Sequence, residues 1–445
     1  MRTTREIIKT LLTNIGSRKE VEQYLARFAS LEKSQFAIIK VGGGILADPD
    51  SLEALASSLT FLRHVGLVPI VVHGAGPQLS AALAAAGIDS RFEDGLRVTS
   101  PEVLEVARQV FQRENLRLVE ALEAYGTRAR PIPTGVFMAR ASDPERLGLV
   151  GEIEAVDLDP LRSCIRRSGA LPVLSCLGTS PDGQLLNINA DVATRELALR
   201  IKPYKIIFLT PTGGLLDQDG RVLSAINLAE DYGRLVEQPW ISGGMLLKLK
   251  EIRRTLDGLP HTSSVSITRP SQLARELFTH KGSGTLVRRG EQIIRYDGPD
   301  ALERVDTEAL RSLIETCFGR ALAPDYFRSR ELHSIFLSKP LRAAAIVTRG
   351  HAGTPYLDKF AVTPEAQGAG LGGAIWQRLV RKTPRLYWRA RRGNPINPWY
   401  FQQADGSFRR NPWVVFWTGM SALDSQTAAC IDHALSLPAS LAPPA

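Results

Sequence analysis

The sequence predicts an α/β domain built on a mainly parallel sheet, followed by a smaller α+β domain. Continuous apolar runs that end in Gly, Thr or Pro alternate with helical segments from residue 35 to about 290, as buried parallel strands separated by helices do. The texture changes near residues 285–300, where the turn signal YDGPD follows a predicted pair of short strands. The 445 residues also exceed one ordinary core and suit two domains.

The expected elements follow in chain order. Apolar positions at helical spacing predict a separate pair of helices over residues 1–33. The first domain, 34–290, has strands in FAIIKVGGG, VPIVVHGAGP, ALPVLSCLG and YKIIFLTPTGG. In the second domain, 300–425, we expect a helix in VDTEALRSLIETCFG, strands in LRAAAIVTRG, PYLDKFAVTP and RLYWRAR, and a glycine loop that opens a helix in EAQGAGLGGAIWQRLVRK. Residues 426–445 are expected to be a loose C-terminal tail.

The composition is that of a soluble globular protein, with 44% apolar and 23% charged residues. No uninterrupted apolar run reaches the length of a membrane span, so we expect no membrane partner. The four cysteines are scattered and form no CxxC pair, which argues against a zinc site or a disulfide framework and fits a reducing cytoplasm. The polar stretch TNIGSRKE leaves no core for a signal peptide, although a cleaved transit peptide stays open as an alternative.

A net charge of +9 attracts anions without saying which ones. Basic residues crowd between Arg378 and Arg392 around Trp388, which on composition alone is typical of a nucleic-acid groove. The same pattern also describes a solvated face with a packed aromatic side chain, or a surface for phosphorylated and carboxylate small molecules. We expect small-molecule anions as partners and no nucleic acid.

The first candidate site begins at KVGGG, where Lys40 stands at the end of a strand and glycines follow at 42–44. Such glycines let backbone N–H groups approach a phosphate closely, and the lysine adds a positive charge. The loop is not a Walker A motif, because GxxxxGK[ST] does not occur. Its weight comes from the motifs that follow in order, which are HGAG at 73–76, GLRVT at 95–99, NINAD at 187–191 and SGGMLLKLK at 242–250.

In this order the motifs resemble the amino acid kinase family, and specifically its N-acetylglutamate kinases, over about residues 35–290. The resemblance implies a three-layer αβα fold and phosphorylation of N-acetyl-L-glutamate by ATP with Mg²⁺, with no residue assigned as a metal ligand. It implies that Lys40 and Lys248 hold the transferring phosphoryl group and that Asp191 orients both lysines. Read alone, Asp191 would be a helix N-cap and Lys248 a surface lysine.

The resemblance also assigns binding residues. Those implied to hold N-acetylglutamate are Gly43, Gly44, Ala75, Gly76, Arg97 and Asn187. Those implied to hold ATP are Pro211, Thr212, Gly213, Gly214, Leu215, Leu216, Trp240, Ile241 and Ser242. The chemistry is consistent with such a set: a carboxylate needs no general base to attack phosphorus, whereas the repulsion between two anions calls for positioned cations and N–H donors.

The second candidate site is the loop EAQGAGLGG at 365–373, which lies before a predicted helix. A glycine turn at a helix N-terminus presents unpaired N–H groups to an anion such as pyrophosphate. On spacing alone a dinucleotide loop stays open, but the spacing resembles the acetyl-CoA loop of GNAT-type N-acetyltransferases. The residues that this resemblance assigns to acetyl-CoA are Gln367, Gly368, Ala369, Gly370, Leu371, Gly372 and Gly373.

The flanks of this loop carry a closer resemblance. The segments YLDKFAV at 356–362, LYWRARRGNPINPWYFQQADGSF at 386–408 and WVVFWTG at 413–419 resemble the acetyltransferase domain of the vertebrate-like N-acetylglutamate synthases. The resemblance implies that L-glutamate is held by Lys359, Phe360, Arg389, Arg391 and Asn394, and that Tyr400 protonates the departing thiolate of coenzyme A. Read alone, Tyr400 would be a packed aromatic residue.

A further segment, ARELFTHKGSGT at 274–285, resembles the arginine-binding segment of arginine-sensitive acetylglutamate kinases. It implies that Glu276 and Gly282 contact L-arginine as an effector. In that family an N-terminal helical segment promotes oligomers, so residues 1–33 imply a homo-oligomer, with a tetramer as one option. The alternative is that these helices cap the kinase core.

Together the resemblances predict a cytoplasmic, bifunctional enzyme of arginine biosynthesis. Its C-terminal domain would be an N-acetylglutamate synthase and its N-terminal domain an N-acetylglutamate kinase. Two alternatives stay open: a synthase whose kinase-like domain only senses arginine, and a non-catalytic regulatory binding protein.

Overall fold

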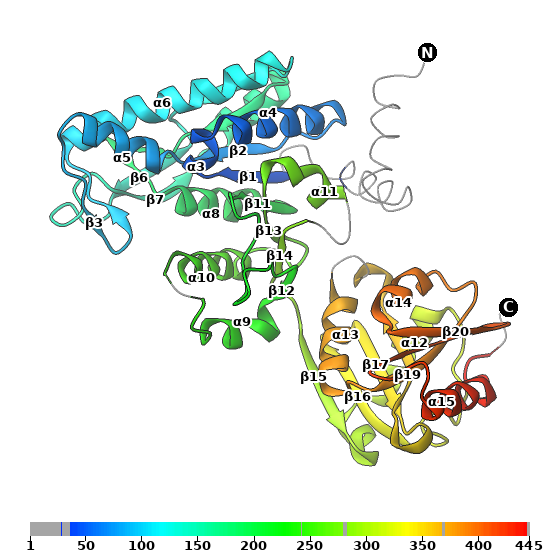
Figure 1. The fold of residues 1–445 in the computed structure, drawn as a ribbon. Helices are drawn as coiled ribbons and strands as arrows, with labels where there is room; N and C mark the ends of the chain where they lie inside the picture. The colour runs from blue at the N-terminus through cyan, green and yellow to red at the C-terminus, as the bar shows by residue number, and fades with distance from the viewer. Residues whose placement is uncertain (1–27, 29–35, 242, 279–282, 367–369, 443–445) are drawn as a thin grey trace, which may run out of the picture. The chain divides into compact units, whose positions relative to one another are not determined.

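The structure is a computed structural model that describes residue 28 and residues 36–241, 243–278, 283–366 and 370–442. The chain divides into two compact units between Arg289 and Gly290, and each is described by itself (Figure 1). The helices expected over 1–33 lie outside the described residues apart from Phe28. The predicted site residues that also lie outside are Ser242, Gly282, Gln367, Gly368 and Ala369.

The first unit is built on a sheet that has eight strands within the described ranges, in the order β12-β14-β13-β11-β1-β2-β8-β5. From β13 to β5 every neighbouring pair is parallel, whereas β14 runs antiparallel to β13. The strand bounds are β1 Ala37–Val41, β2 Ile70–His73, β5 Ala129–Ile132, β8 Leu171–Leu174, β11 Lys205–Leu209, β12 Ala225–Asn227, β13 Ser264–Thr268 and β14 Thr285–Arg288. The four apolar runs predicted as strands contain β1, β2, β8 and β11.

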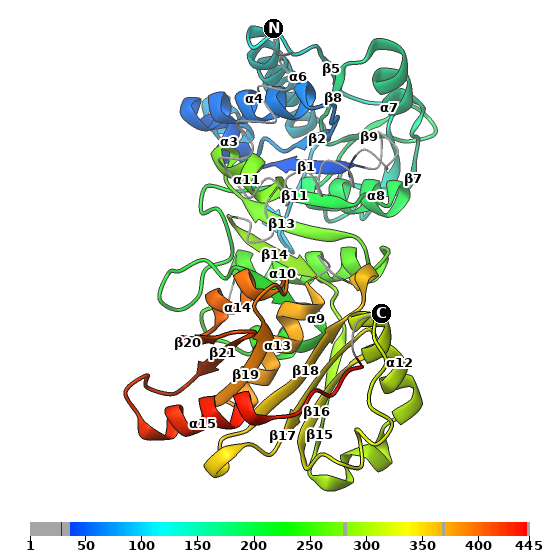
Figure 2. The same cartoon turned by 90° about the vertical axis from the view of Figure 1, so that its right-hand side faces the viewer.

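Helices cover both faces of this sheet because successive residues of its buried strands point to opposite sides. Ile38 and Ile206 pack on one side with α5, α8 and α10, and Ile39 and Ile207 pack on the other with α3, α4 and α11 (Figures 1 and 2). The helix bounds are α3 Gly43–Ala47, α4 Pro49–His64, α5 Gly76–Ala85, α6 Pro101–Ala124, α7 Asp159–Ser163, α8 Ala190–Ile201, α9 Leu228–Val236, α10 Gly243–Asp257 and α11 Leu273–Phe278. The predicted three-layer α/β class is therefore confirmed.

The first unit also contains two smaller sheets, whose strands alternate along the chain with those of the main sheet. A hairpin joins β3 (Phe92–Glu93) to β4 (Leu96–Arg97), and β10-β9-β6-β7 form a second small sheet. Their remaining bounds are β6 Phe137–Ala141, β7 Gly151–Val156, β9 Leu177–Thr179 and β10 Leu185–Asn187.

The second unit is an α+β domain, as predicted, whose sheet runs β15-β16-β17-β18-β19-β21-β20 in the described part of the chain. All neighbours are antiparallel except β18 and β19, which pair in parallel over two residue pairs only. The strand bounds are β15 Gln292–Asp297, β16 Leu332–Lys339, β17 Ala343–Thr348, β18 Tyr356–Val362, β19 Leu386–Arg391, β20 Gly406–Arg410 and β21 Trp413–Thr418. Its helices are α12 Thr307–Phe318, α13 Leu371–Lys382, α14 Asn397–Gln403 and α15 Ser425–Ser436.

The two short strands predicted near residue 290 are present as β14 and β15, but they do not pair with each other. β14 belongs to the sheet of the first unit, while β15 pairs with β16 in the second. β16 was not predicted, and it supplies the partner that β15 needs. The second unit consequently begins at Gly290, ten residues before the expected domain start.

A β-bulge changes the direction of side chains in β18. Ile346 of β17 pairs with Lys359, and the next residue, Val347, pairs with Leu357, so that Asp358 is the extra residue. Without the bulge Asp358 and Lys359 would point to opposite faces. With it, both side chains lie on the face that carries Tyr326, whereas Phe360 lies on the face of α13 and α14.

The expectation of a loose C-terminal tail over 426–445 is also wrong for its first part. Helix α15 is capped by Asp424, whose carboxylate accepts from the Gln426 backbone N–H at 2.9 Å. Cys430 and Ala434 are buried in the same cluster as Tyr387. Short side chains one helical turn apart let this helix pack closely on the sheet. Small residues add little hydrophobicity to the sequence, so composition alone does not distinguish this packed helix from a polar tail.

We expect Ala434→Arg to lower the free energy of unfolding by about 3 kcal/mol, because a long charged side chain replaces a fully buried methyl group. Urea unfolding followed by tryptophan fluorescence measures the change. Ala428→Arg, on the exposed side of the same helix, is the matched control and should shift stability by less than about 0.5 kcal/mol. Equal effects of the two substitutions would contradict the packed position of α15.

Candidate active sites

The first site forms where β1 and β2 end and the helices after them begin. Gly42 is the N-cap of α3, and Ala75 is the N-cap of α5. Gly43 needs its lack of a side chain, since a Cβ atom there would lie 2.7 Å from Pro77 and Gln78. The side-chain amide of Gln78 donates to the Gly43 carbonyl at 2.8 Å and so ties the two loops together.

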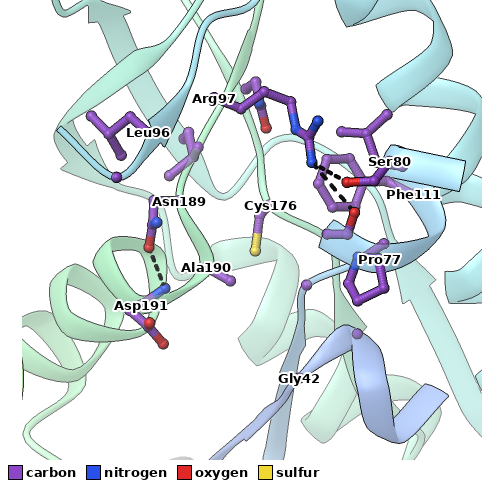
Figure 3. A pocket seen from close by; sticks show the side chains of 18 of the residues that line it. Gly42, Pro77, Ser80, Leu96, Arg97, Phe111, Cys176, Asn189, Ala190 and Asp191 are labelled. Atoms are coloured by element: carbon purple, nitrogen blue, oxygen red, sulfur yellow. Dashed lines mark hydrogen bonds between the residues drawn. The ribbon is translucent and has the colours of Figure 1, made fainter. Parts of the chain in front are cut away.

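Lys40 and Asp191 form an ion pair at this edge of the sheet. Lys40 Nζ lies 2.8 Å from Asp191 Oδ1, and the side chains are 15% and 33% exposed. The N-cap of α8 is Asn189, whose side-chain oxygen accepts from the Asp191 backbone N–H at 2.8 Å (Figure 3). Asp191 is therefore not a helix cap, and its carboxylate is directed at the lysine.

Lys248 on α10 is half-buried, in contrast to the exposed Lys250 on the same helix. Burial lowers the pKa of its ammonium group, the nearby charge of Lys40 lowers it further, and Asp191 opposes both effects. These interactions place Lys248 within electrostatic reach of the Lys40–Asp191 pair. The reading of Lys248 as an ordinary surface lysine does not fit this environment.

A cavity of about 450 Å³ opens beside the ion pair. Arg97 extends into it and donates to Ser80 Oγ at 2.8 Å, to Ser90 Oγ and to the Gly76 carbonyl, while its guanidinium lies over the ring of Phe92 with 4.5 Å to the centroid (Figure 3). Burial lowers the pKa of this guanidinium, which nevertheless stays charged at neutral pH. A buried arginine held by hydroxyl groups and a carbonyl suits a carboxylate ligand.

The cavity brings together most of the residues predicted to bind N-acetylglutamate. Of that set, Gly43, Ala75, Gly76, Arg97 and Asn187 line it, together with the predicted catalytic residues Lys40 and Asp191. Asn187 donates to Thr99 Oγ1 at 3.1 Å, and Thr99 in turn donates to the Arg97 carbonyl at 2.9 Å. Gly44 and Lys248 are not among the lining residues.

The segments predicted to bind ATP lie after β11 and before α10. Gly213 has φ +76°, and a Cβ atom there would meet the side chain of Arg269 at 2.8 Å. The Leu215 backbone N–H donates to Thr285 Oγ1 at 2.8 Å, which ties the loop to β14. The exposure of these residues differs: Pro211 and Thr212 are exposed, Leu216 and Trp240 are half-buried, and Gly213, Gly214, Leu215 and Ile241 are buried.

In the second unit, Gly370 is the N-cap of α13 and has φ +80°. Leu371 is buried, and the first turn of the helix continues through Gly372 and Gly373. A Cβ atom at Gly372 would touch Val362 at 3.5 Å, whereas Gly373 faces open space. The described part of the predicted acetyl-CoA loop thus forms a helix N-terminus with little side-chain cover.

Tyr400 and Phe360 lie in an aromatic cluster under α13 and α14. The centroid of the Tyr400 ring lies 5.5 Å from that of Trp388 and 6.5 Å from that of Phe360. Burial raises the pKa of its phenol, so the hydroxyl stays protonated at neutral pH. Asn394 lies in the turn before α14, where its side-chain oxygen accepts from the Ile396 backbone N–H at 3.2 Å.

Lys359 lies on the opposite face of the sheet from Phe360 and is 4% exposed. Its ammonium donates to Asp358 Oδ2 at 2.8 Å, to the Asp358 carbonyl at 3.2 Å and to Ser440 Oγ at 2.6 Å. Burial lowers the pKa of Lys359, and Asp358 opposes the shift. Tyr326 adds a hydrogen bond to the same carboxylate.

Arg389 and Arg391 share the face of Lys359. Their guanidinium groups lie 4.1 Å and 5.2 Å from the centroid of the Trp413 ring. Arg389 also donates to the carbonyls of Ala434 at 2.6 Å and Pro438 at 3.1 Å. The structure therefore groups the three predicted cations for glutamate and places Phe360 and Tyr400 on the other side of β18.

Glu276, the described residue of the predicted arginine site, is buried at the end of α11. Its Oε2 atom accepts from the backbone N–H groups of Ser283 at 2.8 Å and Gly284 at 3.2 Å. This carboxylate thus orders the return of the chain into β14.

Sequence reasoning did not single out three side chains that the structure places at these sites. Asn189 lies inside NINAD, where Asn directly before a helix start is an available capping signal. Asp358 lies inside YLDKFAV, but no pattern in the sequence indicates the bulge that turns it beside Lys359. Cys176 lines the cavity and donates to the His73 carbonyl at 3.2 Å, and burial raises the pKa of its thiol to about 12.

Comparison with known proteins identifies relatives of both units. Residues 35–261 match the amino acid kinase family, and residues 297–435 match the N-acetyltransferase of N-acetylglutamate synthase. The chain is 51% identical over 423 residues to the acetylglutamate kinase of Xanthomonas campestris, which covers 94% of this chain and 98% of that relative. It is 35% identical over 446 residues to human mitochondrial N-acetylglutamate synthase, covering 98% of this chain and 79% of that relative.

A solved structure has a similar fold. It is the N-acetylglutamate synthase of Neisseria gonorrhoeae in complex with coenzyme A and N-acetylglutamate, and it covers 90% of this chain and 98% of its own with a TM-score of 0.65. At 19% identity this similarity concerns the fold alone. Among the described residues, no helix has the length and apolarity to cross a membrane.

His73, next to the cavity at the end of β2, gives the site a pH-dependent stability. The ring is fully buried, and neither nitrogen has a hydrogen-bond partner of good geometry among the described residues. Burial lowers its pKa to about 4, against a smaller opposing effect of the Gly74 backbone. Above about pH 6.5 the ring is neutral in both the folded and the unfolded chain. As the pH falls from about 6.5 toward 4, the unfolded chain takes up a proton before the folded chain does, so the free energy of unfolding decreases.

We expect His73→Leu to reduce the loss of stability between pH 7.5 and pH 5 by about 2 kcal/mol, since the substituted chain has no proton to take up on unfolding. Urea unfolding at the two pH values measures this difference. His64→Gln, at an exposed position, should leave the loss unchanged. A parallel pH dependence for wild type and His73→Leu would show that His73 carries no such penalty.

Proposed function

The chain belongs to the amino acid kinase family and carries, after its kinase domain, an N-acetyltransferase domain of the N-acetylglutamate synthase type, and from this premise we propose that it catalyses two successive steps of arginine biosynthesis. In the first step, acetyl-CoA and L-glutamate give N-acetyl-L-glutamate and coenzyme A. In the second, ATP with Mg²⁺ phosphorylates the side-chain carboxylate of that product to N-acetylglutamyl 5-phosphate.

The observation that carries the kinase assignment is the Lys40–Asp191 ion pair of 2.8 Å beside a cavity that contains Arg97. Arg97 would grip the α-carboxylate of N-acetylglutamate bidentately, and Asn187 would help to orient the substrate. A purely arginine-sensing domain would not need this pair of opposite charges at the strand ends. The intact pair therefore supports catalysis over sensing alone.

In the proposed phosphoryl transfer, the substrate carboxylate attacks the γ-phosphorus and the bond to the β-γ bridging oxygen breaks, releasing ADP. Lys40 and Lys248 would stabilise the charge on the transferring group, and Asp191 would keep both ammonium groups in place and charged. The N–H groups at the starts of α3 and α5 add positive ends of helix dipoles. The Mg²⁺ that accompanies ATP offsets further phosphate charge.

The acetyltransferase assignment rests on the N-terminus of α13 and on the protonated Tyr400. N–H groups after Gly370 would hold the pyrophosphate of coenzyme A. The amino group of glutamate would attack the thioester carbonyl, and the phenol of Tyr400 would donate its proton to the thiolate that leaves. Lys359, Arg389 and Arg391 carry the charge that the two carboxylates of glutamate require.

Regulation, assembly and compartment complete the proposal. L-arginine would act as the effector through the segment that contains Glu276. A homo-oligomer in the cytoplasm is the setting that the resemblance of residues 1–33 and the cysteine pattern suggest.

Replacing Lys40 by Ala should lower kcat of the kinase reaction by about 10²–10³-fold, because one positioned donor to the transferring group contributes about 3–4 kcal/mol. Asp191→Asn should reduce kcat as well, since both lysines lose their orienting charge. ADP release from ATP plus N-acetylglutamate measures the effect. Lys250→Ala, exposed on the helix of Lys248, is the control; an unimpaired kinase in Lys40→Ala would overturn the assignment.

Replacing Tyr400 by Phe should lower kcat of the synthase reaction by about 10²-fold or more, because the leaving thiolate loses its proton donor. Release of coenzyme A thiol from acetyl-CoA plus glutamate measures the loss, and the kinase rate should not change. Tyr387→Phe removes another buried phenol of the same unit and should keep the synthase active. Full synthase activity in Tyr400→Phe would make Tyr400 a packing residue.

A further inference from the structure

The end of the chain returns over the face of the second sheet that carries Lys359. Residues 437–442, which we call the C-terminal strap, follow α15 and run toward the end of α12 (Figure 2). Backbone hydrogen bonds attach the far end: the Ala323 N–H donates to the Ser440 carbonyl at 3.1 Å, and the Ala442 N–H donates to the Ala321 carbonyl at 2.9 Å. Arg320 adds a donation from Nε to the Ala442 carbonyl at 2.6 Å.

The near side of the strap is held by two cations, the buried Lys359 and the half-buried Arg389. Ser440 Oγ lies 2.6 Å from Lys359 Nζ. The carbonyls of Ala434 and Pro438 accept from the two terminal nitrogens of Arg389 at 2.6 Å and 3.1 Å. The strap therefore supplies two acceptors, and the last turn of α15 a third, to the side chains that the proposed function assigns to glutamate.

The three donors of Lys359 are used on the chain itself, and Arg389 donates to two carbonyls of the chain end. An ammonium group has three N–H donors, and Lys359 has three acceptors: two on Asp358 and one on Ser440. One face of the Arg389 guanidinium lies over Trp413. A carboxylate of glutamate could bind Lys359 only by replacing an acceptor that is already present, and Ser440 Oγ is the neutral side-chain acceptor among the three.

We propose that the C-terminal strap is a gate that competes with glutamate for Lys359 and Arg389 and is displaced when the substrate binds. The inference rests on the proposed acetyltransferase function. A carboxylate forms charge-assisted hydrogen bonds, which are about twice as strong as those of a hydroxyl group or carbonyl, so the exchange is favourable once glutamate is present. The closed fraction raises the apparent KM for glutamate without changing the chemical step.

Two substitutions loosen the strap at different ends. Arg320→Ala removes its distant anchor, and Ser440→Ala removes its contact to Lys359. Each should lower the KM for glutamate about 2–5-fold with kcat of the synthase unchanged, because a larger fraction of the protein is open. The KM of the kinase for N-acetylglutamate should stay at the wild-type value.

Matched controls exist in the same unit. Arg304 is an exposed arginine that also donates to a backbone carbonyl, that of Asp297 at 2.8 Å, and Ser436 bonds the His433 carbonyl at 2.9 Å. Arg304→Ala and Ser436→Ala should leave the KM for glutamate within about 1.5-fold of wild type. An unchanged KM in both strap variants would overturn the proposal, as would a rise of several-fold, which would make the strap a wall of the productive pocket.

Hydrogen exchange gives a readout that does not depend on turnover. In the full-length protein, saturating L-glutamate should speed amide exchange at Ala323 and Ala442, whose bonds close the strap. Unchanged or slower exchange at both amides would contradict displacement. If the wild-type protein had no synthase activity, the proposed function would be contradicted. The amide exchange rates at Ala323 and Ala442 would still show whether glutamate displaces the strap.

Discussion

Parallel strand pairing is the constraint on which the first unit depends. Because β11, β1 and β2 run side by side in one direction, their carboxyl ends meet at one edge of the sheet. The loops after them therefore bring Lys40, the start of α3 and the start of α5 together. Asp191 reaches the same edge from α8, so a single ion pair of 2.8 Å connects the sheet to the helical layer at the cavity.

The sequence predicts the framework of this unit well, since four continuous apolar runs followed by glycines leave few alternatives to buried parallel strands. The roles inside a motif are harder to assign. In NINAD, both Asn189 and Asp191 are good capping residues, and only the backbone geometry shows that Asn189 caps α8 and frees the aspartate. The sequence likewise does not predict the burial of His73, because a histidine at the end of a strand can be either solvent-exposed or buried.

In the second unit the sequence predicts the strands around the glycine loop but not which faces their residues occupy. The period of two places neighbours on opposite sides of a sheet, and the bulge at Asp358 breaks that rule. Lys359 and Phe360 are regular neighbours and lie on opposite faces, so the predicted glutamate set divides, with Lys359, Arg389 and Arg391 on one face and Phe360 on the other. The C-terminal helix was missed because Cys430 and Ala434 are small, so its buried side carries little apolar weight.

The bulge also decides how this domain is able to diversify. Substitutions alone change which side chains face each side of β18, but they leave the count of residues before Phe360 intact. Loss of Asp358 would remove the bulge yet keep Lys359 opposite Ile346, so the ammonium group would stay on its face and lose the carboxylate beside it. A change of chain length at this one position would therefore alter the charge around the buried lysine without turning the rest of the strand.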